Sequence, residues 1–90
     1  MSRKEKILKR LLNLPKDFSF EELKQLLSGL GYVELNLGKT SGSRVAFLNE
    51  ETKHIIRLHK PHPQNILKRY QLELIIEELT KRGIIYERQN

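Results

Sequence analysis

Two of the three histidines in this chain lie close together, in the segment His59-Lys60-Pro61-His62-Pro63. Imidazole is the only side chain whose unperturbed titration falls near neutral pH, so two imidazoles three residues apart can share the roles of acid and base. The two prolines fix φ and exclude helix, which predicts a stiff, extended turn. The segment is therefore a candidate site for proton transfer, and the alternative is two surface histidines without a chemical role.

Cationic side chains surround this segment and favour a polyanionic ligand. The whole chain has 17 Lys and Arg against 11 Asp and Glu, a formal net charge of +6. Such a charge is typical of proteins that bind nucleic acids, although basicity alone does not separate RNA, DNA and an anionic membrane. The candidate ligand-binding cations near the histidines are Arg57, Lys60, Lys68 and Arg69.

The sequence predicts no metal site and no cofactor. His59 and His62 could bind a metal together, but the proline-rich loop excludes the helical backbone of the known histidine motifs, and no third ligand stands nearby. Asp17 is the only aspartate, which argues against a Mg²⁺ site built from carboxylates. The chain has no cysteine, so it has neither a disulfide nor a thiolate site, and it is compatible with the cytosol.

The third histidine, His54, follows the acidic turn Glu50-Glu51. We expect it to form local hydrogen bonds rather than to react. The acidic pairs Glu50-Glu51 and Glu77-Glu78 are interpreted as solvated surface.

The length of 90 residues predicts a single domain, 1–90, with a small core. Between Arg3 and Leu14, the apolar residues Ile7, Leu8, Leu11 and Leu12 lie at helical spacing, which predicts a short amphipathic helix within residues 1–14. Lys9 and Arg10 interrupt its apolar residues, and this excludes a signal peptide or a membrane span. We expect the helix to dock on its own domain rather than on a membrane.

A second helix is predicted from about residue 20 to residue 30. Ser19 can cap its start, Glu22 completes a capping box, and Gly31 can adopt the left-handed conformation that ends a helix. Its predicted buried stripe is Leu23, Leu26, Leu27 and Leu30.

Three strands and a third helix are predicted after Gly31. Apolar residues alternate with polar ones in the first two strands, the third strand spans residues 54–58, and short turns predict an antiparallel meander. Gly83 is the predicted stop of the last helix, and residues 84–90 form a tail whose apolar start can cover the core or an edge strand. The predicted inward positions of the strands are Val33, Leu35, Leu37, Val45 and Phe47, and those of the last helix are Ile66, Leu67, Tyr70, Leu74, Ile75 and Leu79.

This order of elements predicts an α+β fold in which helices cover one face of a three-stranded antiparallel sheet. It is the α-β-β-β-α order of the double-stranded RNA-binding fold, with an additional N-terminal helix.

Four features of residues 18–83 together resemble the HicA toxin family. They are Glu22-Leu23-x-x-Leu26-Leu27, Gly31-Tyr32, the turn Gly42-Ser43-Arg44-Val45-x-Phe47 and the loop His59-Lys60-Pro61-His62-Pro63. The match is closest to the branch that has arginine after the Gly-Ser turn and an H-[KR]-P-H-P loop. The resemblance implies a small cytoplasmic bacterial ribonuclease that cuts mRNA, has a double-stranded RNA-binding-like fold, and is silenced by a HicB-type antitoxin.

The chain departs from the better-known HicA proteins at Arg44, where those proteins carry a histidine taken as catalytic. Arginine cannot act as a general base near neutral pH because its guanidinium group stays protonated there. The proton transfers therefore move to His59 or His62, or the activity is weak or lost.

Few parts suffice for a ribonuclease that uses no metal. His59 and His62 can be the base and the acid in either order, Arg44 and Lys60 can supply positive charge, and the backbone N–H groups of Gly42 and Ser43 can hold a phosphate oxygen. The alternative interpretation of Arg44 is a solvated strand residue paired with Glu34, and the glycine and serine can be ordinary turn formers.

Three functional hypotheses follow from the sequence. The first is a ribonuclease toxin, the second is a non-catalytic RNA-binding module of the same fold, and the third is an interaction domain for an acidic protein. The paired histidines favour the first, because a protein that only binds RNA needs cations but no titrating groups on a rigid turn.

Overall fold

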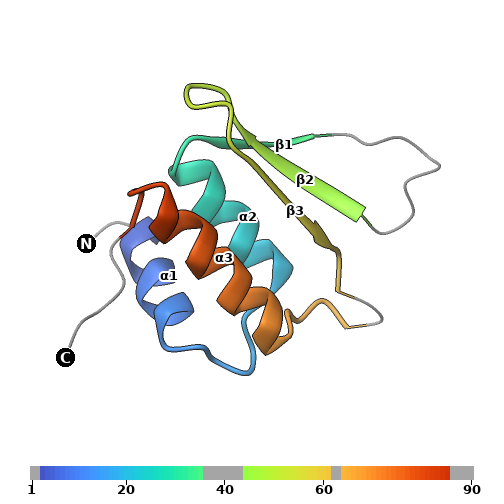
Figure 1. Ribbon diagram of the computed structural model, residues 1–90. Coiled ribbons are helices and arrows are strands. Elements are labelled where there is room, and N and C mark those ends of the chain that lie inside the picture. The colour runs from blue at the N-terminus through green and yellow to red at the C-terminus, as the bar shows by residue number, and fades with distance from the viewer. Residues whose placement is uncertain (1–2, 36–43, 62–63, 86–90) are drawn as a thin grey trace.

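The computed structural model describes residues 3–35, 44–61 and 64–85, which form three helices and one three-stranded sheet (Figure 1). In chain order the elements are α1 (Arg3–Leu12), α2 (Phe20–Gly29), β1 (Tyr32–Leu35), β2 (Arg44–Asn49), β3 (Ile55–His59) and α3 (Arg69–Lys81). The strands are antiparallel and their order in the sheet is β1-β2-β3. This arrangement confirms the predicted double-stranded RNA-binding-like order with an additional N-terminal helix.

The three helices lie on one face of the sheet, and the hydrophobic core fills the space between the two layers (Figure 1). In the sheet, Phe47 lies opposite Ile56 and Val45 lies opposite Leu58, and all four contribute to the core. The helices contribute a larger buried set, namely Ile7, Leu11, Phe20, Leu23, Leu26, Leu27, Leu72, Ile75, Ile76 and Leu79. Each large apolar side chain gains about 1.5–3 kcal/mol from full burial, so this layer contact is the main stabilising force of the fold.

Helix α1 docks on the rest of the chain, as predicted. Ile7 and Leu11 are buried in the core, and the guanidinium of Arg10 joins α1 to the start of α2. Nε of Arg10 donates to Oε2 of Glu22 at 2.8 Å, and Nη2 donates to Oδ1 of Asp17 at 3.1 Å. The hydrogen bonds to Glu22 and then to Asp17 raise the pKa of Arg10 above its ordinary value. The N-terminal helix is thus fixed by apolar burial and by one ion-paired arginine.

The predicted capping box at the start of α2 is confirmed. The N–H of Glu22 donates to Oγ of Ser19 at 3.1 Å, and the N–H of Ser19 donates to Oε1 of Glu22 at 3.1 Å. At the other end, Gly31 has φ of 97°, in the left-handed region that ends a helix at low cost for glycine. The capping box fixes the start of α2, where the backbone of Phe18 and Phe20 forms hydrogen bonds with residues 65 and 67.

The residues predicted to face the core in β1 lie on the opposite face of the strand. Tyr32 is 2% exposed and faces the helices, whereas Val33 is 42% exposed on the other face and Leu35 is half-buried. The remaining predicted inward residue, Leu37, lies outside the described residues. The alternation of apolar residues identified the strand but not which of its faces is buried.

A buried histidine explains the position of Tyr32. His54 is 4% exposed, its Nδ1 lies 2.6 Å from the hydroxyl of Tyr32, and its Nε2 lies 2.9 Å from Oε1 of Glu78. Because a carboxylate only accepts hydrogen bonds, Nε2 of His54 is the donor to Glu78, and the tyrosine hydroxyl is the partner of Nδ1. The prediction that His54 bonds locally is therefore wrong for its side chain, and Glu78 is not merely solvated.

Helix α3 begins later than the apolar spacing predicts. The apolar residues at helical spacing start at Ile66, but the helix begins at Arg69. Ile66 instead forms an isolated antiparallel bridge with Ser19. Two predicted inward residues are also wrong, because Tyr70 is 61% exposed and Leu74 is 38% exposed. The buried stripe of α3 instead begins with Gln71, which is 4% exposed.

The end of α3 and the start of the tail agree with prediction. Gly83 has φ of 71° and ends the helix. Ile85 is 4% exposed in the core and Ile84 packs against it, while Tyr86 lies outside the described residues.

No helix in residues 3–35, 44–61 and 64–85 combines the length and the apolar character needed to cross a membrane.

The buried tyrosine predicts a loss of stability at alkaline pH. Burial raises the pKa of Tyr32 above 10.0, an effect that Arg82 partly offsets and that Glu78 increases. The unfolded chain therefore loses this proton first, so the stabilisation is complete below about pH 10 and is lost as the pH rises through the folded pKa. In urea denaturation, Tyr32→Phe should cost about 1 kcal/mol at pH 8, where it removes a hydrogen bond. Its stability should then decline less steeply than that of the wild type between pH 9 and 11.

Tyr70→Phe is the matched control, since Tyr70 is 61% exposed. It should follow the wild type across the same range. Equal alkaline slopes for the wild type and Tyr32→Phe would contradict this account.

Candidate functional site

Arg44 and His59 lie directly opposite each other across the β2–β3 pair. Directly opposite residues have Cβ atoms about 4.5–5.5 Å apart and point to the same face. Because Val45 and Leu58 face the core, this pair points to the sheet face that the helices leave uncovered, and both side chains are exposed. Arg57 is exposed on the same face, two residues before His59. The sheet thus brings one imidazole and two guanidinium groups to the outer face at one end.

The turn at the opposite end of the hairpin fixes this register. Oδ1 of Asn49 accepts from the N–H groups of Glu51 and Thr52 at 3.0 and 3.1 Å. The N–H of Lys53, which has φ of 65°, donates to the carbonyl of Asn49 at 2.7 Å. Insertion or deletion of one residue in this turn would shift the register by one and move every side chain of β3 to the other face of the sheet. The arginine-histidine pair therefore depends on a turn at the far end of the sheet.

Gln71 of α3 holds the point at which β3 enters the histidine loop. Its Nε2 donates to the carbonyl of His59 at 2.8 Å, and its Oε1 accepts from the N–H of Lys68 at 3.0 Å. Gln71 is 4% exposed, so its amide is largely shielded from water and depends on these two partners for its hydrogen bonds. One side chain thereby joins the end of β3 to the first turn of α3.

The other end of the loop is held by the start of α2. The N–H of Phe20 donates to the carbonyl of Asn65 at 3.0 Å, and the N–H of Leu67 donates to the carbonyl of Phe18 at 2.8 Å. Between these bonds, Ser19 forms an isolated antiparallel bridge with residue 66. The loop that carries the histidines is therefore anchored on both sides by elements that belong to the core.

The candidate cations form two groups rather than one face. Arg44 and Arg57 lie on the outer face of the sheet, but Nζ of Lys60 lies 5.6 Å from the ring centroid of Phe20, on the helix side. Lys68 and Arg69 line a pocket beside the start of α3. Glu34 is the predicted ion-pair partner of Arg44. It lies opposite Phe47 in the β1–β2 pair, and it forms an ion pair with Lys24 at 3.4 Å. The candidate cations therefore lie on both sides of the point where β3 ends at His59.

Several predicted site residues lie outside the described residues, namely Gly42, Ser43, His62 and the adjoining Pro63. Their roles remain predictions. Within the described ranges, no three His, Asp or Glu side chains come together as a possible metal site.

Sequence reasoning missed Gln71, although a signal for it exists. A glutamine in the first turn of a helix, followed directly by the buried Leu72, breaks the apolar pattern on the core side. A buried amide requires hydrogen-bond partners, and in that turn the nearest unpaired backbone groups belong to the helix start and the preceding loop.

Residues 20–80 match a protein family described as the HicA toxin of bacterial toxin-antitoxin systems. The matched region begins at α2 and includes the sheet, the histidine loop and nearly all of α3. Comparisons with curated proteins and with solved structures gave no significant match.

The two hydrogen bonds of Gln71 predict a specific effect of Gln71→Glu. The introduced carboxylate can still accept from Lys68, but it has no N–H for the carbonyl of His59. The variant should lose about 1–3 kcal/mol of stability at pH 7, measured by urea denaturation. NMR order parameters should fall at His59 and Lys60. The deficit should narrow at acidic pH, because a protonated carboxyl regains a donor.

Gln64→Glu is the matched control, because it makes the same chemical change at an exposed position of the same loop. It should stay within about 0.5 kcal/mol of the wild type. Equal effects of the two substitutions would show that Gln71 does not hold the loop.

Proposed function

Because the chain belongs to the HicA toxin family and is thus the toxin of a bacterial toxin-antitoxin system, we propose that it is an endoribonuclease that cleaves mRNA without a metal ion. It would inhibit translation in the cytoplasm by cleaving mRNA. The observation that carries this proposal is the placement of His59 opposite Arg44, beside a loop anchored at both ends.

Cleavage of RNA without a metal needs a base, an acid and positive charge. In the proposed reaction one imidazole removes the proton of the ribose 2′-OH, and the resulting oxygen attacks the adjacent phosphorus. The other imidazole gives a proton to the 5′-oxygen as the P–O bond breaks, which leaves a 2′,3′-cyclic phosphate and a free 5′-hydroxyl. His59 and His62 take these two roles in either order.

Arg44 stabilises the charge that develops on the phosphorane. A guanidinium donates several hydrogen bonds in a fixed plane and stays charged at any physiological pH, which suits an electrostatic role and excludes a base role. The backbone N–H groups of Gly42 and Ser43, just before Arg44 in the chain, add donors for a phosphate oxygen in this proposal. The histidine found at position 44 in better-known members is thus replaced by an electrostatic group, and proton transfer moves to the loop.

The cations contribute binding to the RNA backbone. Arg57 lies on the face of Arg44 and His59, while Lys60, Lys68 and Arg69 lie on the helix side of the loop. An RNA strand that crosses the histidine loop can contact both groups of cations. Its affinity would then fall with salt, because each neutralised phosphate releases counterions.

The same surface suits an antitoxin. Toxin-antitoxin systems pair a toxin with a protein that silences it, and we propose a HicB-type antitoxin with an acidic surface that covers Arg44, Arg57 and His59. Opposite charge on the two partners would speed their association and place the cover over the reactive loop.

The histidine variants test the proposed function. His59→Ala and His62→Ala should each lower the cleavage rate of a mixed-sequence RNA by about 10²- to 10⁴-fold, the usual contribution of an acid or base. Stability should change little for His59→Ala, because that side chain is exposed. Added imidazole should restore part of the activity. Cleavage should persist with a chelator present, and the products should carry 2′,3′-cyclic phosphate.

Lys53→Gln and Arg44→Gln form a charge-matched pair for the same assay. Each removes one positive charge, but Lys53 lies in the turn at the far end of the hairpin. Only Arg44→Gln should slow cleavage. Loss of activity with a chelator and its return with Mg²⁺ would overturn the metal-independent mechanism. RNA binding without any cleavage would favour the non-catalytic RNA-binding module.

A further inference from the structure

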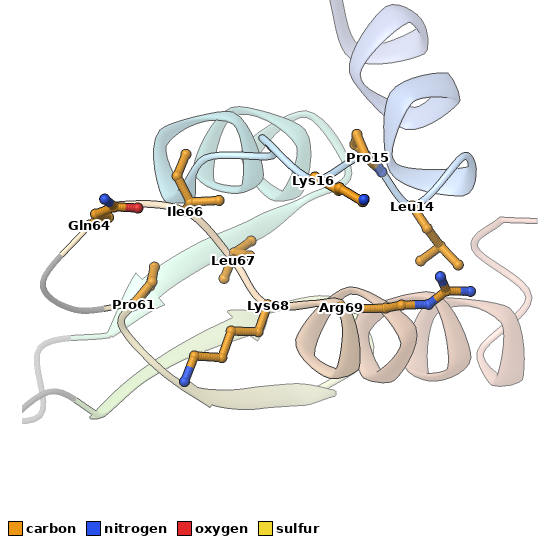
Figure 2. A pocket seen from close by; sticks show the side chains of 9 residues that line it. All are labelled: Leu14, Pro15, Lys16, Pro61, Gln64, Ile66, Leu67, Lys68 and Arg69. Atoms are coloured by element: carbon orange, nitrogen blue, oxygen red, sulfur yellow. The ribbon is translucent and has the colours of Figure 1, made fainter.

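A pocket of about 690 Å³ lies between the α1–α2 connection and the segment that leads from the histidine loop into α3 (Figure 2). Pockets of about 300–1,000 Å³ are the size that holds small organic groups. The lining residues are Leu14, Pro15, Lys16, Pro61, Gln64, Ile66, Leu67, Lys68 and Arg69. Pro61 and Gln64 belong to the histidine loop, so the pocket adjoins the candidate site.

The charged side chains that line this pocket are all cations. They are Lys16, Lys68 and Arg69, and none of the described lining residues is acidic. In Figure 2, Arg69 extends from the start of α3 toward Leu14, whereas Lys68 extends away from it. Arg69 pairs with Glu73 at 3.3 Å, but both side chains are more than half exposed. Such a pair contributes little, so the guanidinium can bind another anion at small cost.

The pocket also has an apolar lining. Leu14, Pro15, Pro61 and Ile66 supply it from both sides of the pocket. The chain adopts φ of 51° at Leu14, in the left-handed region that leucine rarely occupies. Leu14 is half-buried and packs partly against the hydrophobic core, and it also lines this pocket. The pocket thus combines an apolar surface with positive charge and adjoins the positive end of the α3 dipole.

This combination matches one nucleotide. A base presents a flat apolar surface, and its phosphate presents a negative charge a short distance away. We propose that the pocket is a subsite for RNA, in which Lys16 and Arg69 bind a backbone phosphate and the apolar wall of Leu14, Pro15 and Pro61 holds a base. The inference rests on the proposed function, because the occupant is a nucleotide of the strand whose neighbouring phosphodiester is cleaved at the histidine loop. The subsite holds the strand while the loop acts on it.

Salt titrations separate the phosphate contacts from the base contact. The ligand is a fluorescent 2′-fluoro RNA of mixed sequence and about ten nucleotides, which lacks the 2′-OH and is not cleaved. Lys16→Gln should weaken binding and lower the slope of log affinity against log salt by about 0.7. Adding Arg69→Gln should lower it by about the same amount again. Leu14→Asn should weaken binding severalfold with the slope unchanged, because it removes an apolar contact and not a charge.

Two controls test whether the effects come from a change in net charge or from a loss of folding. Lys53→Gln loses the same charge far from the pocket, and it should leave the slope unchanged. Asparagine adopts positive φ readily, so Leu14→Asn should remain folded, which urea denaturation checks. A wild-type slope for Lys16→Gln, or an equal decrease for Lys53→Gln, would overturn the subsite. So would pocket variants that change affinity for an acidic protein partner but not for RNA.

Cleavage assays on the same variants separate this inference from the proposed nuclease activity. If the wild type binds RNA with the expected slopes but cleaves none, the subsite stands and the nuclease fails. If the wild type cleaves RNA while the pocket variants bind and cleave like it, the subsite is wrong and the nuclease stands. If the wild type does not bind RNA, both are wrong.

Discussion

The buried amide of Gln71 is the interaction on which the geometry of the candidate site depends. It donates to the carbonyl of His59 and accepts from the N–H of Lys68, so it fixes the end of β3 relative to the start of α3. The loop between these two points carries the histidines, and its far side pairs with the backbone at the start of α2. A flexible loop would have to be ordered at each binding event, at a cost in conformational entropy. A loop anchored at both ends by core elements avoids much of this cost, and it fixes the backbone at His59.

The order of the elements could be predicted because each has local signals. The capping box of Ser19 and Glu22, the positive φ of Gly31, and the turn between β2 and β3 depend only on neighbours in the chain. The residues of the candidate site could also be identified one by one, from residue type and from resemblance. That Arg44 lies opposite His59 could not, because the sequence shows where the β2–β3 turn lies but not which hydrogen bonds Asn49 forms in it, and these bonds set the strand register.

The failed predictions share a cause, which is that contacts between distant segments override local spacing. Tyr32, not Val33, is buried in β1, because its hydroxyl reaches His54, 22 residues further on. The apolar run from Ile66 has the spacing of a helix, yet its backbone pairs with the start of α2 and stays extended. Gln71 occupies a place in the core that a sequence pattern assigns to an apolar residue. Polar groups that are buried because they find distant partners are the ones that periodicity cannot identify.

In the proposed reaction, a ribose 2′-OH attacks the adjacent phosphorus at the histidine loop. The most direct measurement is the cleavage of an oligodeoxynucleotide that contains a single ribonucleotide, within the context that the wild-type protein cuts in RNA. The account predicts one cut, on the 3′ side of that ribose, with a 2′,3′-cyclic phosphate on the upstream product, and none when the same position carries 2′-O-methyl. Cleavage of the methylated or the all-DNA strand at a comparable rate would contradict it.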